Sequence, residues 1–289
     1  MPQELQPLIG KVPHVKSHRL PPYRGIVAVD AKDFTGHRSI QHPEISRAIP
    51  NLLQHSLNRA KLADIWEDRR FPASTGDGYV FGCDPAAMPF LIHPWLGVLQ
   101  ETLTEFNVHS AGTLRLRLRV SLHIGPLPDD GAESDGNGTP RNDTHRLLDS
   151  RPVKMMLAAS SENVTQVAAI LSDRCFEDAV ASGYTGRHPD HFIEVPATVP
   201  GKPFAQRGWL HVPAPSGNLY DRRILGDRVI DELESAPATP TAPAPTSAAD
   251  RPAGTSTVYR VDRGFQNNGQ VQGGQTWNDH SGDRGRGDR

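Results

Sequence analysis

Two acidic residues near the start of the chain combine a carboxylate with a backbone that lets a phosphate approach. Asp30 closes the apolar run at 25–30, and Asp77 stands between Gly76 and Gly78. Hard cations such as Mg²⁺ prefer oxygen ligands and commonly take one or two protein carboxylates together with substrate phosphates. The sequence therefore predicts a divalent-metal site formed by Asp30 and Asp77 on adjacent strands.

The residues that follow Asp30 are suited to hold the phosphates. They read Ala-Lys-Asp-Phe-Thr-Gly over 31–36, as in a turn from a strand into a helix. Backbone N–H groups at the start of a helix have no partner within it and bind anions. We expect this turn to hold a polyphosphate beside the metal.

Three segments carry the patterns of strands. The run at 25–30 is short and apolar, which is typical of a buried central strand. Segment 71–83 holds a Gly-Asp-Gly turn between two arms, which predicts a hairpin with Asp77 at its tip. Over 114–124 apolar and polar residues alternate without a fault, which predicts a strand with one polar face. We interpret the arginines on that face as solvated, namely Arg115, Arg117 and Arg119, and we take the nearby His123 as structural rather than a ligand.

Helical periodicity fills the intervals between these strands. Apolar residues recur at three-to-four spacing over 45–60 and 88–106. Proline removes a helical hydrogen bond. Pro50 is therefore expected to break or kink the first helix, and Pro89 and Pro94 to delay or kink the second.

A further strand and helix complete the predicted fold. The run at 167–171 predicts a strand, and Ser172 is expected to cap a helix that ends near Gly183. This order of elements predicts an α+β sandwich of ferredoxin-like type, with helices packed on a mainly antiparallel sheet.

Composition narrows the classes of function. The 289 residues carry a formal net charge of −2, without the basic excess typical of proteins that bind nucleic acid. Two cysteines are too few for a disulfide scaffold or a Cys-rich zinc site and fit a reducing compartment. No apolar run has the length of a signal peptide or a membrane span. We expect a cytoplasmic protein without a membrane span and without a nucleic-acid partner.

Proline and glycine content divides the chain into regions. Residues 236–253 hold five prolines and no aromatic or branched aliphatic residue, so they cannot bury enough surface to order themselves. The acidic, glycine-rich segment 128–140 is interpreted as a long loop inside the folded part. The predicted regions are a leader at 1–22, a folded domain at 23–213, a disordered Pro/Ala-rich linker at 214–258 and a tail at 259–289.

The tail has a composition that favours assembly between chains. Residues 264–277 include four Gln, two Asn and four Gly, with no charge and no proline. Such side chains can form in-register ladders. The stretch resembles the short amyloid-forming signalling motifs of bacterial and fungal immune proteins, around Val271 and Gln272. A disordered low-complexity end is the alternative.

Four short motifs follow one another inside the predicted domain. They are Asp30 followed after four residues by Phe34 and Thr35, the Gly-Asp-Gly turn at 76–78, His-Ile-Gly-Pro at 123–126, and Gly138, Asn142 and Arg146 at intervals of four. In order and spacing they resemble the class III nucleotidyl cyclases, the family of the adenylate/guanylate cyclase catalytic domain. The resemblance covers about residues 23 to 213 and implies the class III cyclase sandwich as the fold.

The resemblance also implies roles for single residues. Asp30 and Asp77, with Ala31 beside them, would hold two Mg²⁺ or Mn²⁺ ions, and Phe34, Thr35 and Gly76 would contact a nucleoside triphosphate. The active sites would lie at the interface of a homodimer. From the partner chain, Asn142 would position the ribose and Arg146 would stabilise charge on the phosphates. The reaction implied is conversion of the triphosphate into a 3′,5′-cyclic nucleotide and pyrophosphate for signalling.

The sequence departs from the family at the positions that select the base. Ala73, four residues before Asp77, replaces the Lys of adenylate cyclases or the Glu of guanylate cyclases, whereas Asp135 matches the adenylate type. Bacterial members that make cyclic CMP or cyclic UMP in anti-phage defence lack the standard purine-reading pair, so both purine and pyrimidine products stay open. The alternative function is a catalytically inactive cyclase-like adaptor that binds a nucleotide and signals through its tail.

Overall fold

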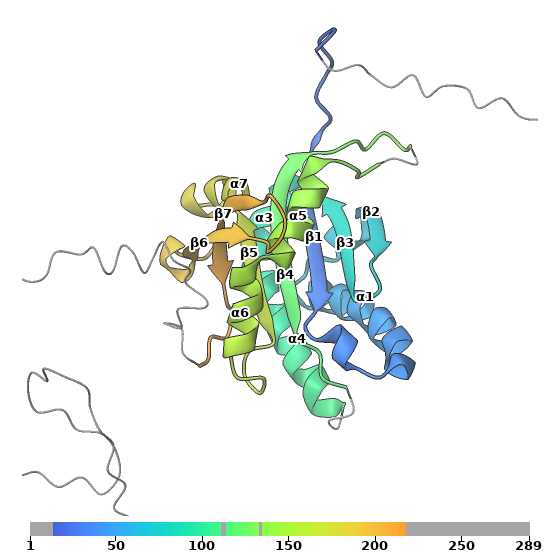
Figure 1. Ribbon diagram of the computed structural model, residues 1–289, viewed down its shortest axis with the longest axis vertical. Helices are drawn as coiled ribbons and strands as arrows, with labels where there is room; N and C mark the ends of the chain where they lie inside the picture. Colours follow the sequence, from blue (N-terminus) through green and yellow to red (C-terminus); the bar gives the residue numbers. More distant parts are fainter. Residues whose placement is uncertain (1–13, 111–113, 133–134, 218–289) are drawn as a thin grey trace, which may run out of the picture. The chain divides into compact units, whose positions relative to one another are not determined.

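A computed structural model of the protein describes residues 14–110, 114–132 and 135–217. Their strands form one seven-stranded sheet in the order β2-β3-β1-β4-β5-β7-β6 (Figure 1). The strands are β1 (Tyr23–Ala31), β2 (Arg70–Ser74), β3 (Gly78–Cys83), β4 (Leu118–Pro126), β5 (Val167–Ser172), β6 (Ile193–Thr198) and β7 (Ala205–His211). Only the β4–β5 pair of this sheet is parallel. The prediction of a mainly antiparallel α+β sandwich is confirmed.

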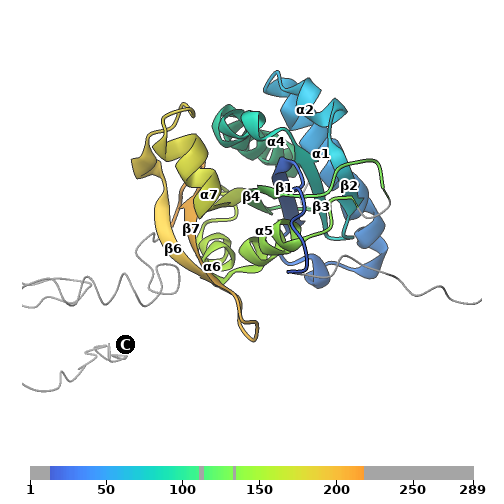
Figure 2. The ribbon, with the colours of Figure 1, turned by 90° about the horizontal axis from the view of Figure 1, so that it is seen from above.

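Helices pack on both faces of the sheet, as Figure 2 shows. They are α1 (His42–Arg59), α2 (Ala63–Glu67), α3 (Met88–Phe90), α4 (Leu96–His109), α5 (Thr139–Asp149), α6 (Arg151–Ala159) and α7 (Asp173–Phe176). Short turns of other helical types lie at Phe34–Gly36, Ser39–Gln41, Pro85–Ala87, Leu91–Trp95, Glu177–Ala181 and Pro189–His191. In the part of the chain that is described, no helix has the length and apolar character needed to cross a membrane.

The alternation along β1 sends its side chains into two different cores. Val27 and Val29 belong to a large buried cluster with residues of α1 and α4. Ile26 and Ala28 point to the opposite face and pack with Leu148 of α5. Because successive side chains of a strand alternate between faces, Asp30 lies on the α5 face. The strand pattern therefore decides on which side of the sheet the Asp30 side chain lies.

The long alternating strand begins later than its pattern predicts. Alternation starts at Leu114, whereas β4 starts at Leu118. The preceding segment is held by a side chain: the Leu116 N–H donates to Asn107 Oδ1 at 2.8 Å, and Asn107 Nδ2 donates to the Leu116 carbonyl at 2.9 Å. The amide of Asn107 thus takes the place of a neighbouring strand at this point.

The proline effects differ between the two long helices. Helix α1 runs through Pro50 without ending, so the predicted break is not formed there. The second helix is interrupted at His93, whose φ of −152° and ψ of 121° are extended, and α4 starts only at Leu96. The delayed start that Pro94 predicts is therefore confirmed.

The element after β5 agrees with its sequence pattern. The Ser172 hydroxyl accepts a hydrogen bond from the Cys175 N–H at 3.2 Å, as an N-cap residue does. The helical segment ends at Ala181, and Gly183 has a φ of +79°, a left-handed conformation that glycine adopts without strain. The structure describes residues 214–217 of the predicted linker at 214–258; the rest of the linker and the tail lie outside the described residues.

Candidate functional site

Asp30 sits at the end of β1 in an ion pair with β4. Its Cα is in register with Arg119 on one side and Gly78 on the other. Arg119 donates from Nε to Oδ1 at 2.6 Å and from Nη2 to Oδ2 at 2.7 Å, which is the two-pronged geometry of a strong carboxylate pair. Asp30 is only 8% exposed. Arg119 was expected on a solvated face; that interpretation is wrong, because its side chain is only 14% exposed and is paired with Asp30.

The environment of Asp30 disfavours the ionised form of its carboxyl group. Burial raises the pKa of its carboxyl to about 7, although the charge of Arg119 and its hydrogen bonds act in the opposite direction. The charges of Asp77 and of Asp149, at the end of α5, raise the pKa further. A buried carboxylate with carboxylates nearby is a site that gains from additional positive charge.

Asp77 reaches this site through the turn of the β2–β3 hairpin. The hairpin forms as predicted, with Gly76 at φ +90° in its turn. The Ala31 N–H donates to the Asp77 carbonyl at 2.8 Å, which ties the turn to the residue after Asp30. A Cβ on Gly78 would lie 2.2 Å from the Val29 carbonyl oxygen, so only glycine lets the strands approach this closely.

The three predicted metal contacts, Asp30, Ala31 and Asp77, are thus brought together. Among the described residues, no group of three or more His, Cys, Asp or Glu side chains is placed to hold a metal ion. Two carboxylates suit Mg²⁺, which keeps several waters and shares its coordination with phosphates. The donor set therefore fits a hard cation that arrives with a nucleotide.

The turn after β1 is shaped differently from the predicted strand-to-helix turn. Residues 34–36 form a short 3₁₀ turn, and the first long helix starts only at His42. Phe34 stacks on the His42 ring with centroids 4.2 Å apart, while Thr35 is exposed. The N–H groups of Gly36 and His37 donate within the turn, so these two are not available to a phosphate.

Asn142 and Arg146 lie one helical turn apart on α5, so they share a face. Asn142 is exposed. The Arg146 Nη1 lies 3.4 Å from Asp143 Oδ1, and its guanidinium stands 5.7 Å from the centre of the Phe204 ring. Among the described residues, no hydrogen bond or ion pair joins either residue to Asp30 or Asp77.

The two predicted base-selecting residues are held by the hairpin and by the loop before α5. Ala73 is paired with Val80 and packs against the core on the α5 face. Asp135 closes its own loop by accepting from the Gly131 N–H at 2.8 Å. A Cβ on Gly136 would lie 2.3 Å from the Phe71 ring, so the loop rests against the strand that carries Ala73. Sequence reasoning missed Phe71, because only the folded loop reveals its contact.

His123 lies on the same polar face of β4 as Arg119. Its Nδ1 is buried and has no hydrogen-bond partner among the described residues. Burial lowers the pKa of the His123 imidazole to about 4, with the charge of Asp143 opposing the shift. The ring is therefore neutral at physiological pH, in accordance with a structural residue.

Comparisons with known proteins give structural relatives only. No protein-family model matches the chain, and no curated protein matches it. The guanylyl cyclase Cya2 is similar at 16% identity and a TM-score of 0.45, over 69% of this chain and 95% of that chain. An adenylate/guanylate cyclase/hydrolase from Silicibacter pomeroyi is similar at 16% identity and a TM-score of 0.44, over 66% and 97%. The adenylyl cyclase CyaB from P. aeruginosa is similar at 15% identity and a TM-score of 0.37, over 71% and 97%. At these values the likeness is one of fold, and function is argued from the residues.

Proposed function

We propose that this protein is a metal-dependent nucleotidyl cyclase, which converts a nucleoside triphosphate into a 3′,5′-cyclic nucleotide and pyrophosphate. The observation that carries the proposal is the position of Asp30, buried at the end of β1 beside the turn that presents Asp77. A surface carboxylate would cost nothing to keep charged, whereas this one is held in an environment that favours a bound cation.

Asp30 and Asp77 would hold the two Mg²⁺ or Mn²⁺ ions, together with Ala31. The ions would supply acidification of the ribose 3′-hydroxyl and neutralisation of charge on the triphosphate. In the reaction the 3′-oxygen forms a bond to the α-phosphorus in line with the bond that breaks, and pyrophosphate leaves. Phosphoryl transfer depends mainly on position and charge. The chain's own task is therefore to fix the carboxylates and the nucleotide.

Arg119 has the task of keeping Asp30 oriented and ionised. Its two hydrogen bonds to the carboxylate fix the plane of that group, and its charge opposes the effect of burial. Phe34, Thr35 and Gly76 are proposed to border the nucleotide. Gly76 is tied to α1, because its carbonyl accepts a hydrogen bond from the Ser46 hydroxyl.

The remaining site residues are proposed to come from a second copy. Asn142 is exposed on α5 and can reach across an interface to position the ribose, with Arg146 on the same face to stabilise phosphate charge. Ala73 and Asp135 would border the base. Ala73 offers no polar group to a purine edge, so the identity of the substrate base is to be determined by experiment.

We place the protein in the cytoplasm and propose that its product is a signal, with bacterial defence as the setting. The linker at 214–258 and the tail at 259–289 would connect the domain to homotypic or heterotypic assembly. These proposals rest on the sequence resemblances.

The test incubates the purified full-length protein with each of the four ribonucleoside triphosphates and Mn²⁺, with detection of cyclic product by mass. We expect product from at least one nucleotide, and its loss in Asp77→Asn. The matched control is Asp190→Asn, which removes an exposed carboxylate away from the site. If folded, dimeric protein gives no product from any nucleotide, the enzymatic proposal is wrong. If Asp30→Ala with Asp77→Ala keeps the biological effect, the adaptor alternative holds.

A further inference from the structure

A small basic recess lies beside the proposed metal site. It has a volume of about 260 Å³, slightly below the range of roughly 300–1,000 Å³ typical of pockets for drug-sized ligands. The recess is formed where the turn after β1, the segment that leads into β4 and the loop between α6 and β5 meet. Its lining residues are Lys32, Asp33, Gly36, His37, Arg115, Arg117 and Glu162. A compact, charged ligand suits this size and lining.

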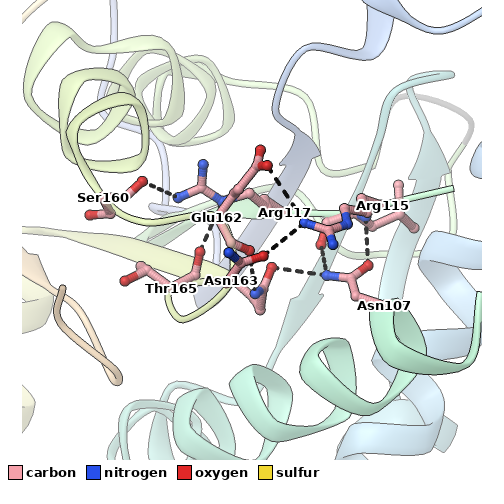
Figure 3. Close-up of polar contacts among 9 residues, drawn as sticks. Asn107, Arg115, Arg117, Ser160, Glu162, Asn163 and Thr165 are labelled. Carbon is pink, nitrogen blue, oxygen red and sulfur yellow. Dashed lines mark hydrogen bonds and ion pairs between the residues drawn. The ribbon is translucent and has the colours of Figure 1, made fainter. Parts of the chain in front are cut away.

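Arg117 is the distinctive residue of the recess. Its Nε donates to the Thr165 carbonyl at 2.9 Å, and its Nη2 lies 3.3 Å from the Ser160 carbonyl (Figure 3). These bonds use neutral carbonyls, and in the described part of the chain no carboxylate lies within ion-pair distance of the guanidinium. Burial lowers the pKa of Arg117, with the charges of Glu162 and Asp33 opposing the shift. The chain thus maintains a partly buried positive charge whose third nitrogen has no partner in Figure 3.

The other cations of the recess have carboxylates beside them. Arg115 lies 3.5 Å from Glu162 and donates to Asn163 Oδ1 at 3.0 Å. Lys32 pairs with Asp33. Apart from His37, the lining holds three cations and two carboxylates, which leaves one net positive charge. Arg115, Glu162 and Asp33 are exposed, so their pairings are weak and can be exchanged for a ligand.

The backbone that carries Arg117 is fixed from α4. Besides binding both polar groups of Leu116, Asn107 donates to Gln166 Oε1 at 2.9 Å. Gln100 Oε1 accepts from the N–H groups of Gln166 and Val167 at 2.8 and 3.0 Å. The arginine and the loop that faces it are therefore preorganised, and a bound ligand does not need to order them.

The recess lies next to the proposed metal site in the direction of the β4 chain. Arg117 precedes Arg119 by two residues, which is about 7 Å along an extended chain, on the same face. The Lys32 N–H donates to the Arg117 carbonyl at 2.9 Å, so the two walls of the recess are joined just past Asp30. A phosphate chain held by a metal ion at Asp30 would therefore extend along this face to Arg117.

We propose that this recess is a binding site for a condensed phosphate, and that in the cyclase reaction it takes up the pyrophosphate end of the substrate. The link to pyrophosphate rests on the proposed function. Guanidinium groups bind phosphate through paired hydrogen bonds, and Arg117 offers such donors without losing a carboxylate partner. Lys32 and Arg115 supply further charge after they exchange their present partners.

The test measures binding of inorganic pyrophosphate to the full-length protein by calorimetry, with EDTA present to remove divalent metal. We expect Arg117→Gln to weaken binding by about tenfold or more, the loss of one charge-assisted hydrogen bond. Lys32→Gln should weaken it by a smaller factor and serves as the second variant if Arg117→Gln fails to fold. The matched control is Arg174→Gln, since Arg174 is exposed and pairs with Asp178 on α7 and the turn that follows it.

Two outcomes overturn the proposal: absence of metal-free pyrophosphate binding, or equal affinities for the wild type, Arg117→Gln and Lys32→Gln. A 3′-deoxynucleoside triphosphate with Mn²⁺, which cannot cyclise, distinguishes two sources of the phosphate. If Arg117→Gln weakens its binding as well, the phosphates enter the recess while still part of the nucleotide. If only pyrophosphate binding changes, the recess does not take up the phosphates of the substrate, and that part of the proposal is wrong. Because this binding needs no turnover, it can succeed even where the search for a cyclic product fails.

Discussion

The raised pKa of Asp30 gives a prediction about stability that can be tested without any substrate. Between the ordinary carboxyl pKa of 3.8 and the value of about 7 in the folded protein, the native state holds a proton that the unfolded state has lost. Fewer protons on the unfolded chain mean that stability falls as pH rises through this window. Each full pH unit between the two pKa values costs about 1.4 kcal/mol, which gives about 4 kcal/mol in total. Because the carboxyl is half deprotonated at its folded pKa, the loss between pH 5 and pH 7 is about 2 kcal/mol.

The perturbation is Asp30→Asn, which keeps the shape of the side chain and removes its titration. The free energy of unfolding is measured by urea denaturation from pH 5 to pH 8 in EDTA for both proteins. We expect the wild type to lose about 2 kcal/mol relative to Asp30→Asn between pH 5 and pH 7, and almost nothing further above about pH 8. Using the difference between the two proteins removes the contribution of other titrating groups. Asp190→Asn, a change at an exposed carboxylate, should leave the pH dependence of the wild type unaltered.

A constant difference between wild type and Asp30→Asn across this range would refute the reasoning. It would mean that Arg119 fully compensates the burial of Asp30 and keeps its pKa near the ordinary value. Addition of Mn²⁺ gives a second test of the ionisation of Asp30. A bound cation favours the ionised carboxylate, so the metal should reduce the loss of stability at pH 7 in the wild type and have a smaller effect on Asp30→Asn.

Two further predictions concern the hairpin and the proposed interface. Gly78→Ala would place a Cβ 2.2 Å from the Val29 carbonyl oxygen and should lower the free energy of unfolding, measured by denaturation, by about 1–3 kcal/mol. Gly36→Ala, with open space around it, should lower it far less. Equal losses of stability in the two variants would contradict the close approach of the strands. If active sites are shared between two chains, a one-to-one mixture of Asp77→Asn and Arg146→Ala, each inactive alone, should regain about a quarter of wild-type cyclase activity, because half of the dimers are mixed and each has one intact site. A mixture as inactive as its components would place both residues in the same chain's site.

The individual elements of this site could be predicted from local sequence. Asp30 is marked by the end of an apolar run, Asp77 by its flanking glycines, and the shared face of Asn142 and Arg146 by their spacing. Each of these patterns spans fewer than ten residues, and the structure places each residue on the predicted kind of element.

The partnership of Asp30 with Arg119 could not be read in the same way. It depends on the register between β1 and β4, and the two residues are 89 positions apart in the chain. Alternation reveals only which face a side chain takes. The late start of β4 has a similar origin, since the amide of Asn107 competes for the backbone that a strand would use. The signals that sequence reasoning lacked are thus long-range pairings rather than local preferences.

The ion pair at the end of β1 also balances the charge of Asp30 from within the fold. Arg119 occupies the position of a counter-ion to Asp30, so the fold can form before any metal arrives. A divalent cation must then compete with the Arg119 guanidinium, which is fixed in the fold, for the Asp30 carboxylate. A cation without a nucleotide gains Asp77 as the second predicted carboxylate ligand in return. A cation that brings phosphates offers Arg119 a new anion in return. On this basis the site would bind the metal–nucleotide complex more tightly than the free metal ion.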